Sequence, residues 1–145
     1  MSVISQSMTE DHRRCDELFA DAESAAADND WSRAHSNYDA FREAILHHFR
    51  MEEELLFPRF EQQTGMTMGP TQVMRSEHAQ MRELFEEMEG AVVAQQQDRF
   101  LGLCETLLML MQQHNAKEEQ MLYPMTDQAL GNAAAGELLE QMRAL

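Results

Sequence analysis

Apolar residues recur at helical spacing, three and four positions apart, along most of this chain. Polar, glycine or proline breaks interrupt the pattern at residues 28–30, 64–70, 95–98, 124 and 131. The pattern therefore predicts four long amphipathic helices and one shorter helix, over residues 7–27, 31–57, 70–94, 98–123 and 132–145. Because short connections join the long helices, we expect an all-α fold, an up-down-up-down four-helix bundle against which the C-terminal helix docks.

The two halves of the chain are similar when one is shifted by 66 residues, the separation of His12 and His78. Residues 11–58 then align with residues 77–124 without a gap, and Leu56-Phe57-Pro58 falls on Leu122-Tyr123-Pro124. Two copies of so long a unit do not make a solenoid. We therefore expect a pseudo-twofold bundle built from duplicated helical hairpins.

Length and charge narrow the classes of protein that remain. The 145 residues fit one domain, residues 1–145, with the bundle core over residues 7–124. The net charge of −15 disfavours binding to nucleic acid or to anionic membranes. No apolar run is long enough to span a membrane, and Met1–Glu10 lack a secretory signal pattern, so we expect a cytoplasmic protein. The sequence leaves the oligomeric state open.

The sulfur-containing residues have an ordinary structural interpretation. Cys15 and Cys104 each lie inside an apolar helical pattern, which favours reduced, buried thiols over a disulfide. The thirteen methionines are mostly core residues, because methionine fills irregular gaps between helices.

One histidine of each long helix keeps its place in the repeat, and glutamates follow two of them. The histidines of the second and fourth helices are each followed four residues later by a glutamate. This spacing places the imidazole and the carboxylate on one stripe of the helix. The neighbours on that stripe are apolar, so all six side chains should face the core. The candidate residues are His12, His48, Glu52, His78, His114 and Glu118.

The four histidines should also lie at one level of the bundle. His12 lies about 17 residues before the first turn and His48 about 18 residues after it, and the other two flank the third turn at similar distances. Buried imidazoles and carboxylates without partners would cost about 1–3 kcal/mol each, and more for a charged group. A metal site removes this cost.

The ligand types and their number fit two metal ions. Imidazole and carboxylate suit iron, manganese or zinc, and no set of thiolates indicates copper or an iron–sulfur cluster. If Glu52 and Glu118 both bridge, each ion receives two nitrogens and two oxygens. A shared oxo or hydroxo group would still leave a position for a small ligand, while the pairing of histidines with ions stays open.

This order of residues resembles the hemerythrin-like (HHE cation-binding) family over about residues 11–124. The ferritin-like pattern is absent, because no histidine has a carboxylate three residues before it. The resemblance implies a four-helix bundle that holds a non-haem, carboxylate-bridged di-iron site, with the six candidate residues at the ligand positions.

The resemblance does not imply oxygen transport. Oxygen-carrying members place a histidine four residues after the third-helix histidine and an aspartate five residues after the fourth-helix one, and this chain has Arg82 and Glu119 there. The chain is therefore more similar to the branch that contains iron-sensing and iron-centre-repair proteins.

Two classes of function follow from these expectations. As a binding protein, the chain would bind O2 or NO, or handle iron as a sensor, scavenger or repair factor. As an enzyme, it would reduce O2, peroxide or NO with electrons from a separate redox partner, since no flavin or nicotinamide motif is present. We favour binding, with catalysis as the alternative, and a bundle without metal stays as a third interpretation.

The remaining polar residues of interest are expected to be less central. His35 and His47 lie off the ligand stripe, so we expect surface or interhelical roles. Glu53 and Glu119 lie about 140° from that stripe and are expected to be solvated. Glu23 and Glu89 lie on the same stripe as the histidine of their helix. We expect them either to reach solvent at the end of the bundle or to form an acidic route to the site.

Overall fold

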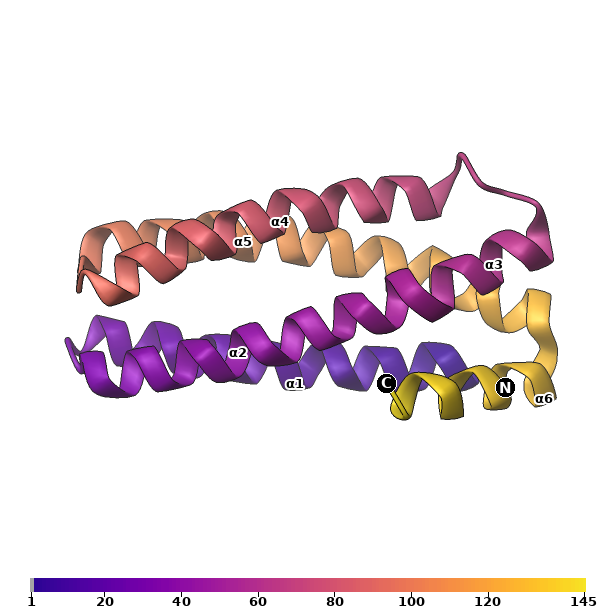
Figure 1. Cartoon of the computed structure of the whole chain (residues 1–145), viewed down its shortest axis with the longest axis horizontal. Helices are drawn as coiled ribbons and strands as arrows, with labels where there is room; N and C mark the ends of the chain where they lie inside the picture. Colours follow the sequence, from indigo (N-terminus) through magenta and orange to yellow (C-terminus); the bar gives the residue numbers. More distant parts are fainter. Residues whose placement is uncertain (1) are drawn as a thin grey trace.

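Helices arranged as a bundle make up nearly all of the computed structural model, which describes residues 2–145 (Figure 1). Met1, where the expected domain begins, lies outside the described residues. The elements in chain order are α1 (Val3–Ala27), α2 (Trp31–Met51), η1 (Glu52–Leu56), α3 (Phe57–Thr64), α4 (Pro70–Val93), α5 (Gln97–Lys117), η2 (Glu118–Leu122) and α6 (Tyr123–Arg143). No strand occurs between residues 2 and 145, so the predicted all-α class and helical bundle are confirmed.

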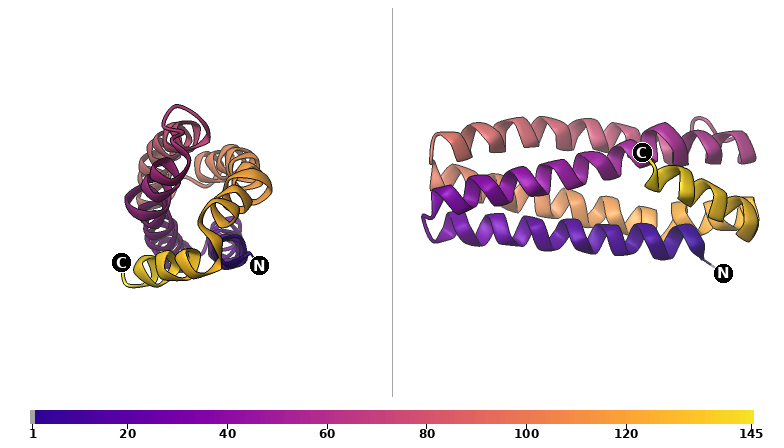
Figure 2. Two further views of the ribbon diagram at one scale, coloured as in Figure 1. Left: turned by 90° about the vertical axis from the view of Figure 1, so that its right-hand side faces the viewer. Right: turned by 60° about the horizontal axis from the view of Figure 1, so that its bottom comes forward.

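Two helical hairpins, α1–α2 and α4–α5, lie side by side with both of their turns at one end of the bundle (Figures 1 and 2). Each turn contains one residue with a left-handed backbone, Asn29 or Gln95, both at φ 56°. The next residue closes each turn, because Asp30 N–H donates to the Ala25 carbonyl and Gln96 N–H donates to that of Ala91. These bonds satisfy carbonyl groups that the helix ends would otherwise leave free.

Both hairpins continue through a π-helical turn after their second helix. The turns η1 and η2 begin at Glu52 and Glu118, and Phe57 and Tyr123 follow them. The Phe57 N–H donates to the carbonyl of Glu52, and the Tyr123 N–H donates to that of Glu118. In this i→i+5 pattern residue i+5 lies above residue i, which does not happen in an α-helix. Each π-turn therefore carries two side chains, five positions apart, to the same side.

The C-terminal segment differs from the prediction in one respect. We expected the fourth helix to end at Tyr123 and Pro124, but helical structure continues through both. Proline is tolerated there because it lies in the first turn of α6, directly after the wider π-turn. The chain bends instead at Gly131, with φ 80° and ψ 168°, and the segment after it lies beside α1 (Figure 2).

The apolar interior consists of two clusters. One lies toward the hairpin turns and includes Phe19, Phe41, Phe85 and Phe100. The other lies toward the opposite end, where α3 and α6 join the packing, and includes Leu56, Phe60 and Leu138. The buried histidines and glutamates belong to neither cluster. The bundle thus places a polar layer between two apolar blocks.

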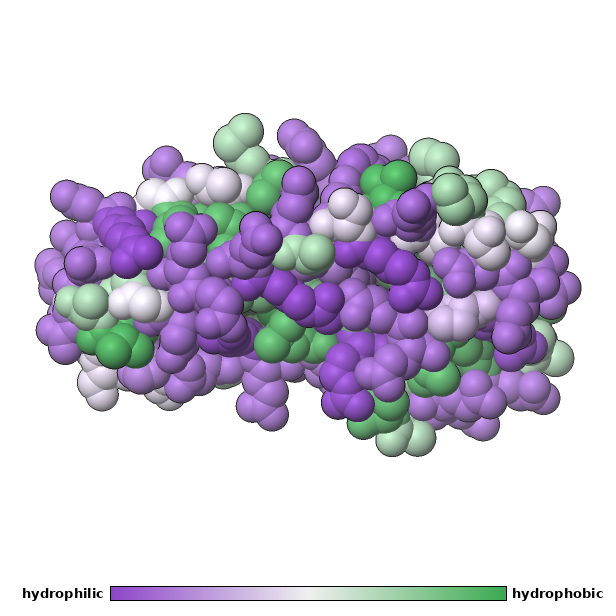
Figure 3. Space-filling model, turned by 45° about the horizontal axis from the view of Figure 1, so that its top comes forward, coloured by the Kyte–Doolittle hydropathy of each residue, from purple (hydrophilic) through white to green (hydrophobic). Residues whose placement is uncertain are grey.

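The surface is dominated by hydrophilic side chains, with separate apolar ones such as Met68 and Met109 among them (Figure 3 shows one face). Among the described helices, none combines the length and apolar character that crossing a membrane demands.

The start of α1 is capped by a residue distant in sequence. Ser2 makes no side-chain cap. Instead, the buried carboxylate of Asp127 accepts hydrogen bonds from the N–H groups of Ile4 (2.8 Å) and Ser5 (2.9 Å). A negative charge also interacts favourably with the positive end of the helix dipole. Asp127 therefore fastens α6 to the start of the helix that carries His12.

We expect Asp127→Ala to lower the free energy of unfolding of the metal-free protein by about 1–2 kcal/mol, because two amide donors lose their acceptor. Thermal and urea unfolding, followed by circular dichroism, measure this loss. The adjacent exposed residue supplies the control, and Gln128→Ala should change stability little. Equal effects of the two substitutions would contradict the capping role.

Candidate metal centre

Six side chains converge in the polar layer from the four long helical segments. The structure brings together every residue that the sequence singled out: His12 of α1, His48 of α2, Glu52 of η1, His78 of α4, His114 of α5 and Glu118 of η2. All six are at most 2 % exposed. The six side chains therefore face the interior at one level of the bundle, as the sequence predicted.

The six residues divide into two sets of four that share both glutamates. One set joins His12 and His48 to the glutamates, and the other joins His78 and His114 to them. Within each set, the possible ligand atoms lie within 4.8 Å of one another. This pairing of histidines is the assignment that the sequence left open.

Each glutamate presents one oxygen to each set. The Oε1 atom of Glu118 lies 3.0 Å from His12 Nε2, and its Oε2 atom lies 3.3 Å from His114 Nε2. Glu52 does the same, with Oε2 3.6 Å from His48 Nε2 and Oε1 3.1 Å from His78 Nε2. Both carboxylates thus lie between the two halves, as bridging ligands would.

A carboxylate holds the outer nitrogen of every histidine in the layer. The four Nδ1 atoms lie 2.7–2.8 Å from carboxylate oxygens, in the pairs His48–Asp11, His12–Glu119, His78–Glu53 and His114–Glu77. An Nδ1–H that donates to a carboxylate fixes the ring orientation and leaves Nε2 free to bind a metal. Histidines that bind metal ions usually donate their other ring N–H to a carboxylate, a backbone carbonyl or water.

The expectation that Glu53 and Glu119 are solvated is wrong. Their side chains are only 21 % and 34 % exposed, and each accepts a hydrogen bond from a histidine of a neighbouring helix. Glu53 is also held by two hydrogen bonds from Arg82, of 2.8 and 2.9 Å. The signal that could have identified the outer partners is a carboxylate directly before His12 and His78 and a second glutamate directly after Glu52 and Glu118.

Hydrogen-bond acceptors are in excess inside the layer. If each Nδ1 is the protonated nitrogen, the four Nε2 atoms and the oxygens of Glu52 and Glu118 all present lone pairs to one small volume. His78 Nε2 lies only 3.2 Å from His114 Nε2. Glu52 Oε1 and Glu118 Oε2 have no hydrogen bond, although imidazole nitrogens lie near them. A cation would satisfy all of these atoms together.

Tyr123 supplies a hydroxyl group to the layer, and sequence reasoning missed it. Its Oη lies 2.7 Å from Glu52 Oε2 and 2.9 Å from Glu118 Oε1, and its one proton can be donated to either carboxylate. The same atom lies 3.2 Å from the Nε2 atoms of His12 and His48. Tyr123 therefore serves one half of the layer only.

Aromatic rings close the other half. The ring of Phe49 stacks on His78 with centroids 3.8 Å apart, and Phe57 lies 5.7 Å from the same imidazole. Phe57 is the repeat counterpart of Tyr123, and it carries no hydroxyl. The two halves consequently have similar ligands but different surroundings.

The pKa values show how the layer is charged when only protons are available. Burial alone would lower the pKa of His48, but the charge of Glu52 and the bond to Asp11 raise it to about 10. Burial also opposes the rise at His114, where Glu118 raises the pKa to about 9. Conversely, His48 is the main reason that the pKa of Glu52 lies well below its usual range despite burial. Protons on His48 and His114 thus offset part of the carboxylate charge of the layer.

The groups outside the layer behave largely as expected. His35 lies at the surface, 3.5 Å from Asp39 and 3.8 Å from Glu89, and His47 lies beside a hollow near the C-terminal helix. Cys15 and Cys104 are buried free thiols, and burial raises the pKa of each to about 12.

Comparison with known proteins agrees with this geometry. The fold and the buried histidine–glutamate layer define a helical bundle able to hold metal ions. The model of the hemerythrin HHE cation-binding domain matches residues 3–126, and the chain belongs to this family. Membership implies binding of cations, typically iron. No curated protein and no solved structure matches the chain.

We expect the metal-free protein to lose stability as the pH rises from 6.5 to 8.5. The pKa values of His48 and His114 are raised from 6.5 to about 10 and about 9 on folding, so their stabilisation is complete below pH 6.5 and is lost as the pH approaches these values. Thermal unfolding in the presence of a chelator tests this. His48→Asn should make the melting temperature depend less on pH, whereas the control His35→Asn should not. A melting temperature that rises between pH 6.5 and 8.5 would contradict the raised pKa values.

Proposed function

We propose that the protein holds two iron ions, bridged by Glu52 and Glu118, and that it binds O2 or NO at this centre or handles iron itself. The observation that carries the proposal is that the two oxygens of each carboxylate face different pairs of histidines. One oxygen lies toward His12 and His48, and the other lies toward His78 and His114. An oxo or hydroxo bridge would complete the pair, and manganese or zinc suits the same ligands.

The burial of the layer favours a very small external ligand. The six candidate ligands are at most 2 % exposed, and apolar clusters lie on both sides of them. An organic substrate would have to displace these clusters, whereas a diatomic molecule or a metal ion needs little space. This supports ligand binding or iron sensing, scavenging or repair over chemistry on a larger molecule.

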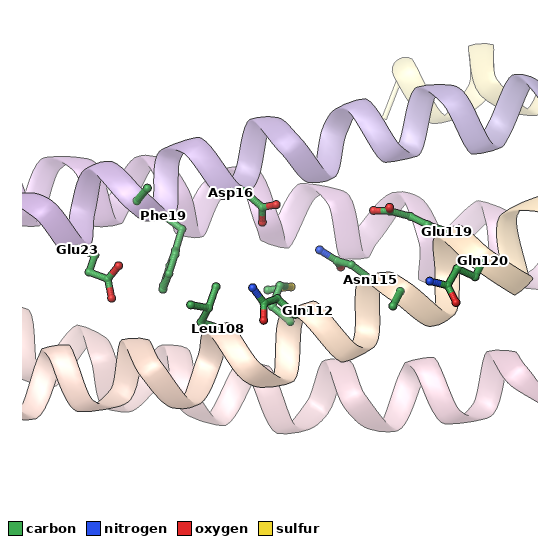
Figure 4. Close-up of a pocket in the computed structure, with 11 residues that line it drawn as sticks. Asp16, Phe19, Glu23, Leu108, Gln112, Asn115, Glu119 and Gln120 are labelled. Atoms are coloured by element: carbon green, nitrogen blue, oxygen red, sulfur yellow. The ribbon is translucent and has the colours of Figure 1, made fainter.

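A groove between α1 and α5 provides the route that we propose for ions and protons (Figure 4). It has a volume of about 470 Å³, and Glu23, Asp16 and Glu119 lie along it. The Glu119 carboxylate, which lines this groove, accepts the hydrogen bond from His12 Nδ1. Glu89 lies elsewhere, next to Arg42 and His35, so only Glu23 supports the acidic route suggested by the sequence.

We also infer that the bundle is a duplicated hairpin with pseudo-twofold symmetry. The left-handed turn residues, the π-turns and the histidine–carboxylate pairs each occur twice, always 66 residues apart. A dinuclear centre on such an axis would receive equivalent ligands from both hairpins, which supports two ions over one.

We expect anaerobic reconstitution with ferrous iron to give two irons per chain. Elemental analysis with visible absorption after oxidation measures this, and a ratio near one or zero would contradict the dinuclear centre. His48→Ala and His114→Ala should lose metal because each removes a ligand. His35→Ala is the control, since its side chain is 46 % exposed and lies outside the layer.

We expect the reduced di-iron protein to form stable adducts with O2 or NO that are reversed when the gas is removed. Stopped-flow absorption with each gas, and with peroxide, measures this. A catalyst would instead consume O2, peroxide or NO continuously when a reductant or electron-transfer protein is added. Sustained turnover would replace the binding function with the enzymatic alternative.

A further inference from the structure

The two halves of the metal layer differ at one pair of equivalent positions. Each π-turn brings the residue five positions after its glutamate toward the layer, and this residue is Phe57 in the first hairpin and Tyr123 in the second. Both side chains are fully buried. The hairpins therefore present a bare ring to one half and a hydroxyl group to the other.

The hydroxyl oxygen of Tyr123 lies among all four ligand atoms of its half. Its distances to Glu52 Oε2, Glu118 Oε1 and the Nε2 atoms of His12 and His48 span 2.7–3.2 Å. Metal–ligand bonds of about 2.0–2.2 Å place ligand atoms at right angles about 3 Å apart. The oxygen thus has the spacing of a fifth ligand atom around a shared ion.

The other half has no such group. Its carboxylate oxygens, Glu52 Oε1 and Glu118 Oε2, are the two that lack a hydrogen bond. The rings of Phe49 and Phe57 lie against His78 there, and neither carries a polar atom. An ion in that half would keep a position free for an external ligand.

We propose that Tyr123 is a seventh protein ligand, which binds through Oη to the ion held by His12 and His48 and directs the external ligand to the ion held by His78 and His114. This inference rests on the proposed iron centre. On coordination, an oxygen–metal bond replaces the phenol O–H bond, the proton leaves to solvent, and no electron is transferred.

The chain contains only two tyrosines, which makes the test direct. Tyr38 lies in the apolar cluster near the hairpin turns and donates its hydroxyl to the Phe85 carbonyl, away from the layer. The protein is loaded anaerobically with ferrous iron and then oxidised. Iron content, visible absorption and resonance Raman spectra are measured for the unsubstituted protein, Tyr123→Phe and Tyr38→Phe.

We expect tyrosinate-to-iron(III) charge transfer, with enhanced tyrosine ring vibrations, in the unsubstituted protein and in Tyr38→Phe. Tyr123→Phe should lose these signals completely and still bind about two irons. If two irons bind without tyrosinate vibrations in the unsubstituted protein, the inference is wrong but the iron centre stands. Persistence of the signals in Tyr123→Phe also overturns it. If no iron binds at all, the proposed function fails and this inference fails with it.

Discussion

The structure depends on the concentration of hydrogen-bond acceptors in a space that contains almost no donors. Outer carboxylates hold every Nδ1 atom, so the Nε2 lone pairs and the oxygens of Glu52 and Glu118 face one another inside the bundle. Such a set is unfavourable in a dry interior unless positive charge enters it. Although burial opposes it, the carboxylates raise the pKa values of His48 and His114, so these imidazoles hold protons when no metal ion is bound. Metal ions can replace them and also satisfy the two carboxylate oxygens that remain without hydrogen bonds.

The rest of the bundle supports this layer mechanically. Apolar clusters above and below it supply the packing that keeps six polar side chains in place. The left-handed residues Asn29 and Gln95 end their helices at matching points, so the antiparallel helices bring their histidines level. Asp127 fastens the last helix to the first. The turns and Asp127 lie away from the ligands, whereas Phe49 and Tyr123 of the two clusters contact the ligands directly.

Helical periodicity was sufficient to predict the six converging residues, because each is set by the facing of its own helix. It failed for Glu53 and Glu119, which lie off the ligand stripe of their own segment but within reach of a histidine on a helix packed beside it. It also failed at Tyr123, because an α-helical count turns the fifth residue away from Glu118 whereas the π-turn brings it back. The same turn explains why Pro124 does not end the helix. The periodic pattern of the sequence therefore did not predict the contacts between helices or the local changes of helical pitch.

The charges around the layer are not balanced in the same way on both sides. Near His78 and His114, Arg82 pairs with Glu53 and Lys117 pairs with Glu77. On the other side, Arg14 pairs with Asp11, but among the described residues Glu119 has no basic partner except His12. Of the four carboxylates that bond the histidine Nδ1 atoms, Glu119 is the one that lines the groove between α1 and α5. Negative charge without an arginine or lysine partner thus lies at the groove that we propose as the route for ions to the layer.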